Sequence, residues 1–298
     1  MKVAEAFDDF LLYKRSMNVK PGTLTHYRQT FRVFADFLET EKVLEVGAVT
    51  KTVVRKFWVY LQEQDYALPG YIRDLKALFR FIEAEKLVDL AFNPVTAAGV
   101  PKAKDKPVKP LNPSAVDRLL EAAGRSTQAA RNRCMLLLLL DTGARVQELL
   151  NVNVSDINQD NRSIQVRGKG DRDRSLYYGY KTARHLNAYL RKDRKPVGDT
   201  PRLFLNDQGN PWTYEGVSQV IKRLKKSAGL PADLPVSAHK FRHTFATQFL
   251  VSGGSALALQ RLLGHSTLEM TRRYSSLADE HLAEAHAKAG PVDRLWGR

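Results

Sequence analysis

The sequence has almost no cysteine. Cys134 is the only one among 298 residues, which excludes a disulfide framework and a metal cluster held by several thiolates. A reducing compartment suits such a chain, so we expect a cytoplasmic protein. His239 and His243 stand one helical turn apart, but Lys240 occupies the position that glutamate takes in an HExxH zinc motif. We therefore expect no metal site.

Long hydrophobic runs are also missing. The longest is "CMLLLLL" at 134–140, far short of the roughly 20 apolar residues that a helix needs to cross a bilayer. Acidic residues interrupt the first turns of the chain, in "MKVAEAFDDFLLYK", where a secretory signal requires an apolar centre. We expect no association with a membrane.

Acidic residues are few relative to basic ones. The chain has 47 Lys and Arg against 32 Asp and Glu, a formal charge of +15, which favours a polyanionic partner, nucleic acid before a membrane surface. Residues 1–109 hold 18 basic and 14 acidic side chains, and the remainder holds 29 and 18. The basic surface therefore belongs mainly to the second part of the chain.

The first hundred residues have helical periodicity. Apolar residues recur at three- and four-residue steps in 24–38, in 50–65 and in 70–86, and an opening segment surrounds Phe7 and Leu11. This pattern predicts about four amphipathic helices. We expect a small helical domain over residues 1–93.

Proline and lysine then replace the apolar pattern. The stretch 93–114 has five prolines and four lysines, which predicts a basic linker over residues 94–111. Its lysines either carry solvated charge or lie along a phosphate backbone, and the sequence leaves both readings open.

The remainder, residues 112–298, predicts a mixed domain. Asn112-Pro113 is typical of a helix start, and a buried helix around 130–140 ends at Gly143. "RSIQV" and "RSLYY" predict two strands of a hairpin around "RGKGDRD", and "RLFLN" at 202–206 predicts a third strand. Several helices follow up to residue 288. The expected fold is mainly α with a small antiparallel sheet: an N-terminal helical domain and a C-terminal α+β domain.

Two cationic side chains stand at predicted turns. Arg145 follows a glycine break at the start of a new helix; it is solvated, paired with Glu148, or a phosphate clamp whose planar guanidinium matches two phosphate oxygens. Lys169 lies in the turn of the predicted hairpin. Its ammonium group is either solvated or carried by a mobile hairpin loop that inserts into a nucleic-acid groove. The string lacks the GxxxxGK[ST] spacing of a P-loop.

Four further candidates lie near the C-terminus. His239 and Arg242 lie near the N-terminus of a helix that Ser237 can cap, where backbone N–H groups favour an anion. His265 directly follows Gly264. Tyr274 follows two arginines, and its hydroxyl is either that of an ordinary half-buried ring or a nucleophile, because nearby positive charge favours the phenolate.

In this order the six residues resemble the tyrosine recombinase family, the lambda-type integrases with their Xer-like members. The matching strings are "TGARVQELLNV", "GKGDRDR", "SAHKFRHTFAT", "LLGHS" and "TRRYSSL", and "KPGTLTHYRQTFRVFADFL" resembles the helical core-binding (SAM-like) domain of the family. Lys240-Phe241 departs from the small or polar residue and leucine that are common there. This difference bears on local DNA contacts and leaves the chemistry intact.

The resemblance implies a site-specific DNA recombinase or integrase that cuts and rejoins strands through a covalent 3′-phosphotyrosine, without metal, ATP or another cofactor. Tyr274 is then the nucleophile, and Arg145 and Arg242 neutralise the phosphate oxygens. Lys169 is the general acid and His239 the general base. His265 donates a hydrogen bond to the phosphate.

The resemblance also implies partners. One is double-stranded DNA with paired half-sites. The others are three further copies of the chain, which form a homotetramer on DNA, alone or with a related recombinase. In the cell the protein is then associated with the nucleoid while it is bound to DNA. The helix expected at 277–288 either packs on its own domain or docks into a neighbour. Two other functions remain open, a type IB topoisomerase and a DNA-binding protein without catalysis. Within the recombinases, a Xer-type resolvase, a phage integrase and a transposon recombinase fit equally.

Overall fold

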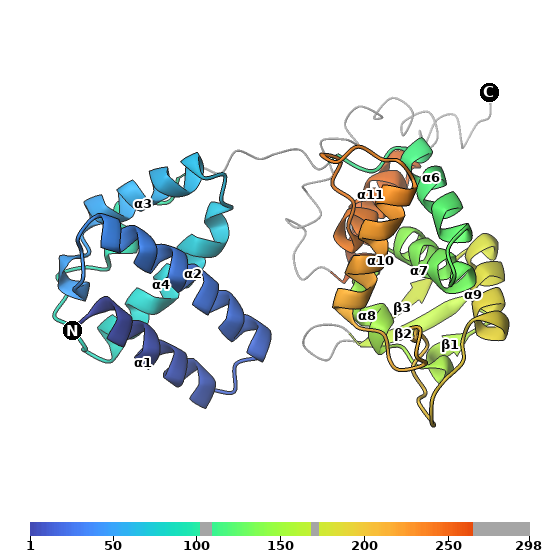
Figure 1. Cartoon of the computed structure of the whole chain (residues 1–298), viewed down its shortest axis with the longest axis horizontal. Coiled ribbons are helices and arrows are strands. Elements are labelled where there is room, and N and C mark those ends of the chain that lie inside the picture. Colours follow the sequence, from blue (N-terminus) through green and yellow to red (C-terminus); the bar gives the residue numbers. More distant parts are fainter. Residues whose placement is uncertain (102–108, 168–172, 265–298) are drawn as a thin grey trace, which may run out of the picture. The chain divides into compact units, whose positions relative to one another are not determined.

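The protein folds into two compact units, Met1–Lys106 and Pro107–Arg298, called unit 1 and unit 2 below (Figure 1). The computed structural model describes residues 1–101, 109–167 and 173–264. Helices dominate both units, and one small antiparallel sheet lies in unit 2. The fold class expected from the sequence is confirmed. No helix of the described segments has both the length and the apolar character required to span a bilayer.

Unit 1 is helical throughout its described residues. Its elements are α1 (Val3–Ser16), α2 (Pro21–Thr40), η1 (Val46–Ala48), α3 (Lys51–Glu63), α4 (Leu68–Ala84) and α5 (Pro94–Ala98). The apolar positions that predicted these helices form one core. Aromatic rings fill much of it, with Phe7 stacked on Phe31 at 4.6 Å and Phe34 tilted against Phe57 at 4.8 Å between ring centroids.

Helix α5 occupies residues that the sequence predicted to begin the linker. The Asn93 side chain caps α5 by accepting hydrogen bonds of 3.1 Å from the backbone N–H groups of Val95 and Thr96, and Val95 is fully buried in the unit 1 core. Five residues are too few to display helical periodicity. The Asn93-Pro94 start signal of α5 is present in the sequence, but it stands at the beginning of a proline-rich stretch that predicts a linker.

Unit 2 is built around a buried helix. It contains α6 (Pro113–Gly124), α7 (Ala129–Thr142), α8 (Val146–Asn151), η2 (Val154–Asp156), α9 (Tyr180–Lys192), α10 (Tyr214–Ser227), α11 (Ala238–Val251) and α12 (Ala256–Leu263). Helices α6, α9 and α11 all pack against α7, which explains why its second half, Cys134–Leu140, is a continuous apolar run. As expected, Asn112 caps α6 with Pro113 in its first turn. Cys134 is buried within α7, and burial raises the pKa of its thiol.

The sheet of unit 2 has the order β1-β2-β3, with β1 (Ile157–Asn158), β2 (Ser163–Arg167) and β3 (Asp173–Tyr177) all antiparallel. The pair β2 and β3 is the hairpin that the sequence predicted. In its register Val166 faces Arg174 and Arg167 faces Asp173.

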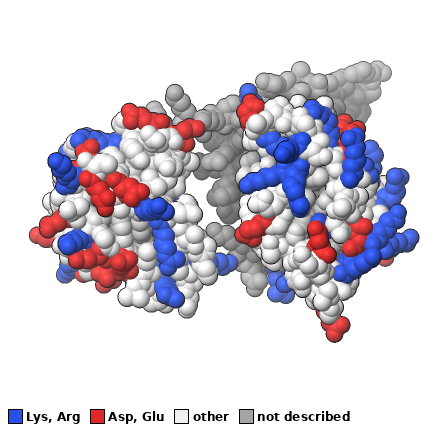
Figure 2. All heavy atoms as spheres, viewed as in Figure 1, with Lys and Arg blue, Asp and Glu red and all other residues white. Residues whose placement is uncertain are grey.

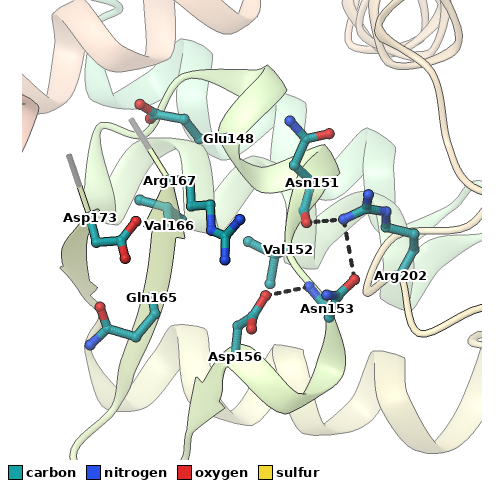
Figure 3. Close-up of a pocket in the computed structure, with 10 residues that line it drawn as sticks. All are labelled: Glu148, Asn151, Val152, Asn153, Asp156, Gln165, Val166, Arg167, Asp173 and Arg202. Carbon is teal, nitrogen blue, oxygen red and sulfur yellow. Dashed lines mark hydrogen bonds between the residues drawn. The ribbon is translucent and has the colours of Figure 1, made fainter. Parts of the chain in front are cut away.

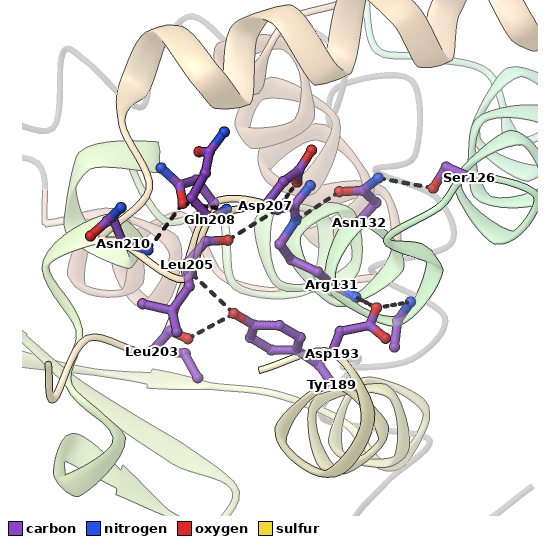
Figure 4. A network of polar contacts seen from close by, with 12 residues as sticks. Ser126, Arg131, Asn132, Tyr189, Asp193, Leu203, Leu205, Asp207, Gln208 and Asn210 are labelled. Carbon is purple, nitrogen blue, oxygen red and sulfur yellow. Dashed lines mark hydrogen bonds and ion pairs between the residues drawn. The ribbon is translucent and has the colours of Figure 1, made fainter. Parts of the chain in front are cut away.

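The prediction of a strand at 202–206 is wrong, and β1 is the third strand instead. Side chains satisfy much of this segment's backbone (Figure 4): the Tyr189 hydroxyl donates to the Leu203 carbonyl and accepts from the Leu205 N–H, both at 3.0 Å. The buried Arg131 guanidinium donates to the Leu205 carbonyl at 3.1 Å. The Leu203 N–H donates instead to the Val152 carbonyl, outside any strand. The segment is therefore largely buried like a strand, but the sequence does not indicate that several of its hydrogen-bond partners are side chains.

Candidate active site

Arg145 lies in the turn between α7 and α8. Gly143 ends α7 in the left-handed conformation, with φ of 60°, and Arg145 directly precedes α8. The Arg145 N–H and guanidinium donate to the Glu148 carboxylate at 2.8 and 2.9 Å. Although Arg145 is paired with Glu148, 40% of its side chain remains exposed, so part of the guanidinium can still bind an anion from solvent.

Glu148 is buried and holds a second arginine. Arg174 of β3 donates to its two carboxylate oxygens at 2.6 and 2.8 Å, and the same guanidinium donates to the Leu262 carbonyl at 3.0 Å. Burial alone raises the pKa of Glu148, but the hydrogen bonds and charge of Arg174 and the hydrogen bonds of Arg145 outweigh it, so the pKa is lowered. Glu148 is therefore a carboxylate at neutral pH and ties α8 to β3.

Arg242 is a buried cation on α11. Its guanidinium donates to the carbonyls of Gly143 and Leu263, each at 2.7 Å, and only 3% of the residue is exposed. These carbonyls lie at the C-terminal ends of α7 and α12, where the helix dipole is negative. Two helix ends therefore fix the orientation of Arg242.

His239 lies in the first turn of α11, which the Ser237 side chain caps as expected. Its ring is 4.3 Å from that of His243, in an edge-to-face arrangement. Burial lowers the pKa of His239, and the positive charges of Arg242 and Arg145 lower it further. At neutral pH this imidazole is neutral and able to accept a proton.

Arg145, His239 and Arg242 thus come together from segments almost a hundred residues apart: the charges of both arginines act on His239, and Arg242 donates to the carbonyl of Gly143, two residues before Arg145. Two guanidiniums beside a helix N-terminus suit a phosphate group, and the neutral imidazole suits proton transfer at that phosphate. Lys169, His265 and Tyr274 lie outside the described residues. The sequence missed the role of Arg174, because its place in "GKGDRDR" gives no sign of a partner on α8; Glu148 was considered only as a partner of Arg145.

A polar cavity of about 540 Å³ lies beside this group, between α8 and β2 (Figure 3). Glu148 borders it, but Arg145, His239 and Arg242 do not. Its Arg202 donates to the Asn151 carbonyl and to the Asn153 side chain. The cavity mixes acidic and basic walls, so it is not an anion site like the Arg145–Arg242 group. Among the described residues, no cluster of His, Cys, Asp or Glu has the makeup of a metal site.

Positive charge also covers α9. Figure 2 shows Lys and Arg crowded along this edge of unit 2, and α9 has no acidic residue. Helix α7 packs against both α9 and α11 and lies between them in Figure 1. The basic surface of unit 2 therefore extends well beyond the Arg145–Arg242 group.

Comparison with known proteins gives a consistent result. Residues 109–281 match the model of the Phage integrase family. The chain is 34% identical over 295 residues to the tyrosine recombinase XerC of Oceanobacillus iheyensis, with 95% of each chain covered. It is 30% identical over 309 residues to the tyrosine recombinase XerD of Mycobacterium tuberculosis, with 97% of each covered.

Among solved structures, the Tn1549 transposon integrase in complex with a circular intermediate DNA superposes with a TM-score of 0.75. The alignment covers 95% of this chain and 99% of that chain, at 22% identity. At this level of identity the likeness shows a common fold.

Proposed function

The chain belongs to the phage integrase family and is a tyrosine recombinase, and we propose that it exchanges DNA strands through a covalent 3′-phosphotyrosine on Tyr274. The relatives named above supply the reaction class, and the resemblance of "TRRYSSL" supplies the residue. Double-stranded DNA with paired half-sites is the proposed substrate.

The proposed chemistry conserves the energy of the phosphodiester. The Tyr274 oxygen bonds to phosphorus while the bond from phosphorus to the 5′-oxygen breaks. The phenol proton passes to His239, and Lys169 gives a proton to the departing 5′-oxygen. A 5′-hydroxyl from the other duplex then reverses both steps and releases Tyr274. His265 donates a hydrogen bond to the phosphate throughout.

One observation carries this proposal: the packing of the chain itself orients Arg242. Its guanidinium is held by two carbonyls and Arg145 by one carboxylate. Charge that develops on the non-bridging oxygens of the transition state meets two preorganised cations. We therefore expect the reaction to need neither a metal ion nor a nucleotide.

We propose that unit 1 and unit 2 act on DNA together. Residues 1–93 form the core-binding domain, residues 94–111 the connection, and residues 112–298 the catalytic domain. The excess of basic residues in both parts supports contacts to phosphates on each side of the connection. The connection also contains α5, which packs into unit 1, so we assign only the part of it beyond α5 to the span between the units.

We propose that four copies assemble on two duplexes, alone or with a related recombinase, by docking residues 277–288 of each copy on the next. An apolar groove of about 470 Å³ on α6, α7 and α11 supports this, with Val116, Leu140, Phe245 and Phe249 in its walls. "LADEHLAEAHAK" has two leucines and small alanines to place there. A head-to-tail contact of this kind closes into a ring when the rotation between neighbouring copies allows it.

Among the three recombinase types, we propose a Xer-type enzyme, because the relatives of similar length carry the names XerC and XerD. The Tn1549 integrase resembles this chain in fold at lower identity, so its biology is not carried over. Action in the cytoplasm, on the nucleoid, follows from the proposed substrate.

The decisive experiment traps the covalent intermediate. A nicked suicide duplex containing the recombination site of the genome from which the chain comes is incubated with the protein in excess EDTA and no nucleotide. The wild-type chain forms a protein–DNA adduct, and Tyr274→Phe binds the duplex but forms none. An adduct in the variant would place the nucleophile elsewhere, and an adduct that forms only with Mg²⁺ would contradict the proposed mechanism.

Two other outcomes distinguish the remaining functions. Relaxation of supercoiled plasmids that lack the site would favour a type IB topoisomerase. Tight binding without any adduct on the suicide duplex would indicate a DNA-binding protein that has lost catalysis.

A further inference from the structure

Asp74 is a buried acid at the junction of α2 and α4. Only 1% of it is exposed, and it is the one ionisable side chain that the described part of unit 1 buries. Asp74 stands among buried apolar residues of α4, with Leu75 next in sequence and Leu78 one turn further along the helix. A carboxylate in such a place needs hydrogen-bond donors on both oxygens.

Three side chains supply those donors. The Thr30 hydroxyl donates to Oδ2 at 2.8 Å, and Nε2 of His26 lies 3.1 Å from the same oxygen. Arg73 approaches the other oxygen with two nitrogens, Nε at 3.0 Å and Nη2 at 2.9 Å from Oδ1. Asp74 therefore has no acceptor oxygen left without a partner.

The partners of Asp74 differ sharply in exposure. Thr30 is buried, but 67% of the Arg73 side chain and 46% of the His26 side chain are exposed. An ion pair with partners this exposed contributes little to folding once the cost of burying the carboxylate is included. Stability alone gives a weak reason for this arrangement. Its clear geometric result is that one buried group holds two surface side chains in fixed positions.

The surface around Arg73 and His26 is basic. Along α2 up to Ala35 and along α4 up to Ile82, Asp74 is the only acidic residue. Lys76 and Arg80 follow Arg73 on the same side of α4, and Lys20 is exposed at the N-terminal end of α2. Arg28 and Arg32 are exposed on other sides of α2. Neither helix has a side-chain cap at its N-terminus, so their first N–H groups add to the positive potential. An anion is the ligand that this surface favours.

We propose that Asp74 is a positioning residue that holds Arg73 and His26 ready to contact the phosphate backbone of the DNA on the α2–α4 face of unit 1. This inference rests on the proposed function for its ligand. The guanidinium N–H groups that Asp74 does not engage are the ones that reach phosphate oxygens. A side chain already ordered in the unbound protein loses less conformational entropy on binding.

The charge of Asp74 and its positioning effect act in opposite directions, which makes the proposal testable. Asp74→Asn removes a negative charge from the binding face, so electrostatics alone would strengthen DNA binding. The amide has one acceptor oxygen where the carboxylate has two, so at least one of Arg73 and His26 loses its fixed orientation. We expect the second effect to dominate and the variant to bind more weakly.

The measurement is the affinity of the full chain for a short DNA duplex of arbitrary sequence, titrated at several salt concentrations. Each phosphate contact makes log affinity fall with log salt concentration with a slope of about −0.9. One contact therefore strengthens binding about eightfold at 0.1 M salt relative to 1 M salt, and Arg73→Ala should lose this factor. Asp74→Asn should weaken it by about three- to tenfold, the range expected for losing the order of one or two long side chains.

Thr30→Val is the matched control. It removes a buried hydrogen bond to the same carboxylate but leaves Arg73 and His26 in place, so it should lower the unfolding midpoint and leave DNA affinity unchanged. A loss of affinity in Thr30→Val that parallels its loss of stability would reduce Asp74 to a structural role. Unchanged or stronger DNA binding by Asp74→Asn would overturn the proposal.

A second comparison keeps the test decisive. In the His26→Ala, Arg73→Ala background, Asp74→Asn should cause no further loss of affinity, because the side chains through which it acts are absent. An equal loss in both backgrounds would also contradict the proposal. If the wild-type chain bound no DNA at all, the proposed function would fail; wild-type binding with an indifferent Asp74→Asn would refute only this inference.

Discussion

Arg174 and Glu148 form a bidentate ion pair, with hydrogen bonds of 2.6 and 2.8 Å, although one lies on β3 and the other on α8. Both are largely buried, with 12% and 7% of their side chains exposed. The pair fixes the hairpin, the start of α8 and, through Leu262, the end of α12 relative to one another. Arg145, one of the two candidate active-site cations, therefore depends on a carboxylate that touches no substrate in the proposed mechanism.

Replacing the Glu148 carboxylate should lower both the stability of the fold and the rate of adduct formation. We expect Glu148→Gln to lower the free energy of unfolding by about 3 kcal/mol, because it leaves a buried arginine without its counter-charge. Adduct formation should fall with it, since Arg145 loses the same partner. Chemical denaturation and suicide-substrate cleavage measure the two effects.

An exposed ion pair in the same unit provides the control. Arg125 and Glu121 are 76% and 62% exposed, so Arg125→Ala should change stability by less than about 1 kcal/mol. Equal effects of the two substitutions would show that burial does not determine the importance of the Glu148 pair.

Gly143 should not tolerate a side chain. Its φ is +60°, and a Cβ there would lie 2.3 Å from Cδ1 of Phe245 and 2.8 Å from Cδ2 of Leu263. Gly143→Ala should therefore shift the carbonyl that holds Arg242 and reduce the rate of adduct formation by more than tenfold, a barrier increase of about 1.4 kcal/mol or more. Single-turnover cleavage measures this.

Gly198→Ala is the control that separates the effect of backbone strain from the effect of displacing Arg242. Its φ is +64°, but nothing lies within 4 Å of a Cβ added there, so Gly198→Ala adds backbone strain of about 1 kcal/mol without moving Arg242. Cleavage by this variant should stay at the wild-type rate. A similar loss in both variants would indicate that general destabilisation slows the reaction.

The acid limb of the cleavage rate should reflect His239. Because burial and the charges of Arg242 and Arg145 lower its pKa, the imidazole stays neutral below pH 6.5, where an ordinary histidine is half protonated. At subsaturating DNA, where the rate reports the free enzyme, cleavage should therefore decline only below about pH 6.5. At saturating DNA the bound phosphate should move the decline to higher pH. An acid limb that persists unchanged in His239→Gln would assign it to another group.

The proposed docking of residues 277–288 predicts the effect of a truncation. A chain that ends after Ser276 should bind a single half-site nearly as well as the wild type but fail to pair two duplexes and recombine them. Gel-shift titration and a plasmid recombination assay measure the two steps. Recombination at the normal rate by the truncated chain would show that the segment belongs to its own domain.

Sequence patterns predicted those features of the fold whose causes are local. The apolar steps of α2, the Asn112-Pro113 start of α6 and the break at Gly143 each follow from neighbouring residues, and the structure confirms them. The segment 202–206 has the composition of a strand, but its partners Tyr189 and Arg131 lie on other helices. A hydrogen bond between this backbone and a side chain of a distant helix leaves no pattern in the neighbouring sequence.

The candidate site also contains residues that local motifs indicate and residues whose roles depend on distant partners. Arg145, His239 and Arg242 were found because each stands in a recognisable string, and the structure brings these three together. The sequence does not indicate the roles of Arg174 and Asp74, because these roles depend on side chains that other elements bring to them. The roles of all six residues, including Lys169, His265 and Tyr274, which lie outside the described residues, remain predictions from the sequence.

The burial of Cys134 has a practical consequence. The only thiol of the chain sits in the middle of α7 with no exposed surface, and its raised pKa keeps it protonated, so maleimide reagents should leave it untouched. A single cysteine introduced at exposed Tyr66 or exposed Val197 is then the one site that takes a fluorophore. Each unit can be labelled separately for single-molecule fluorescence while the native core stays unmodified.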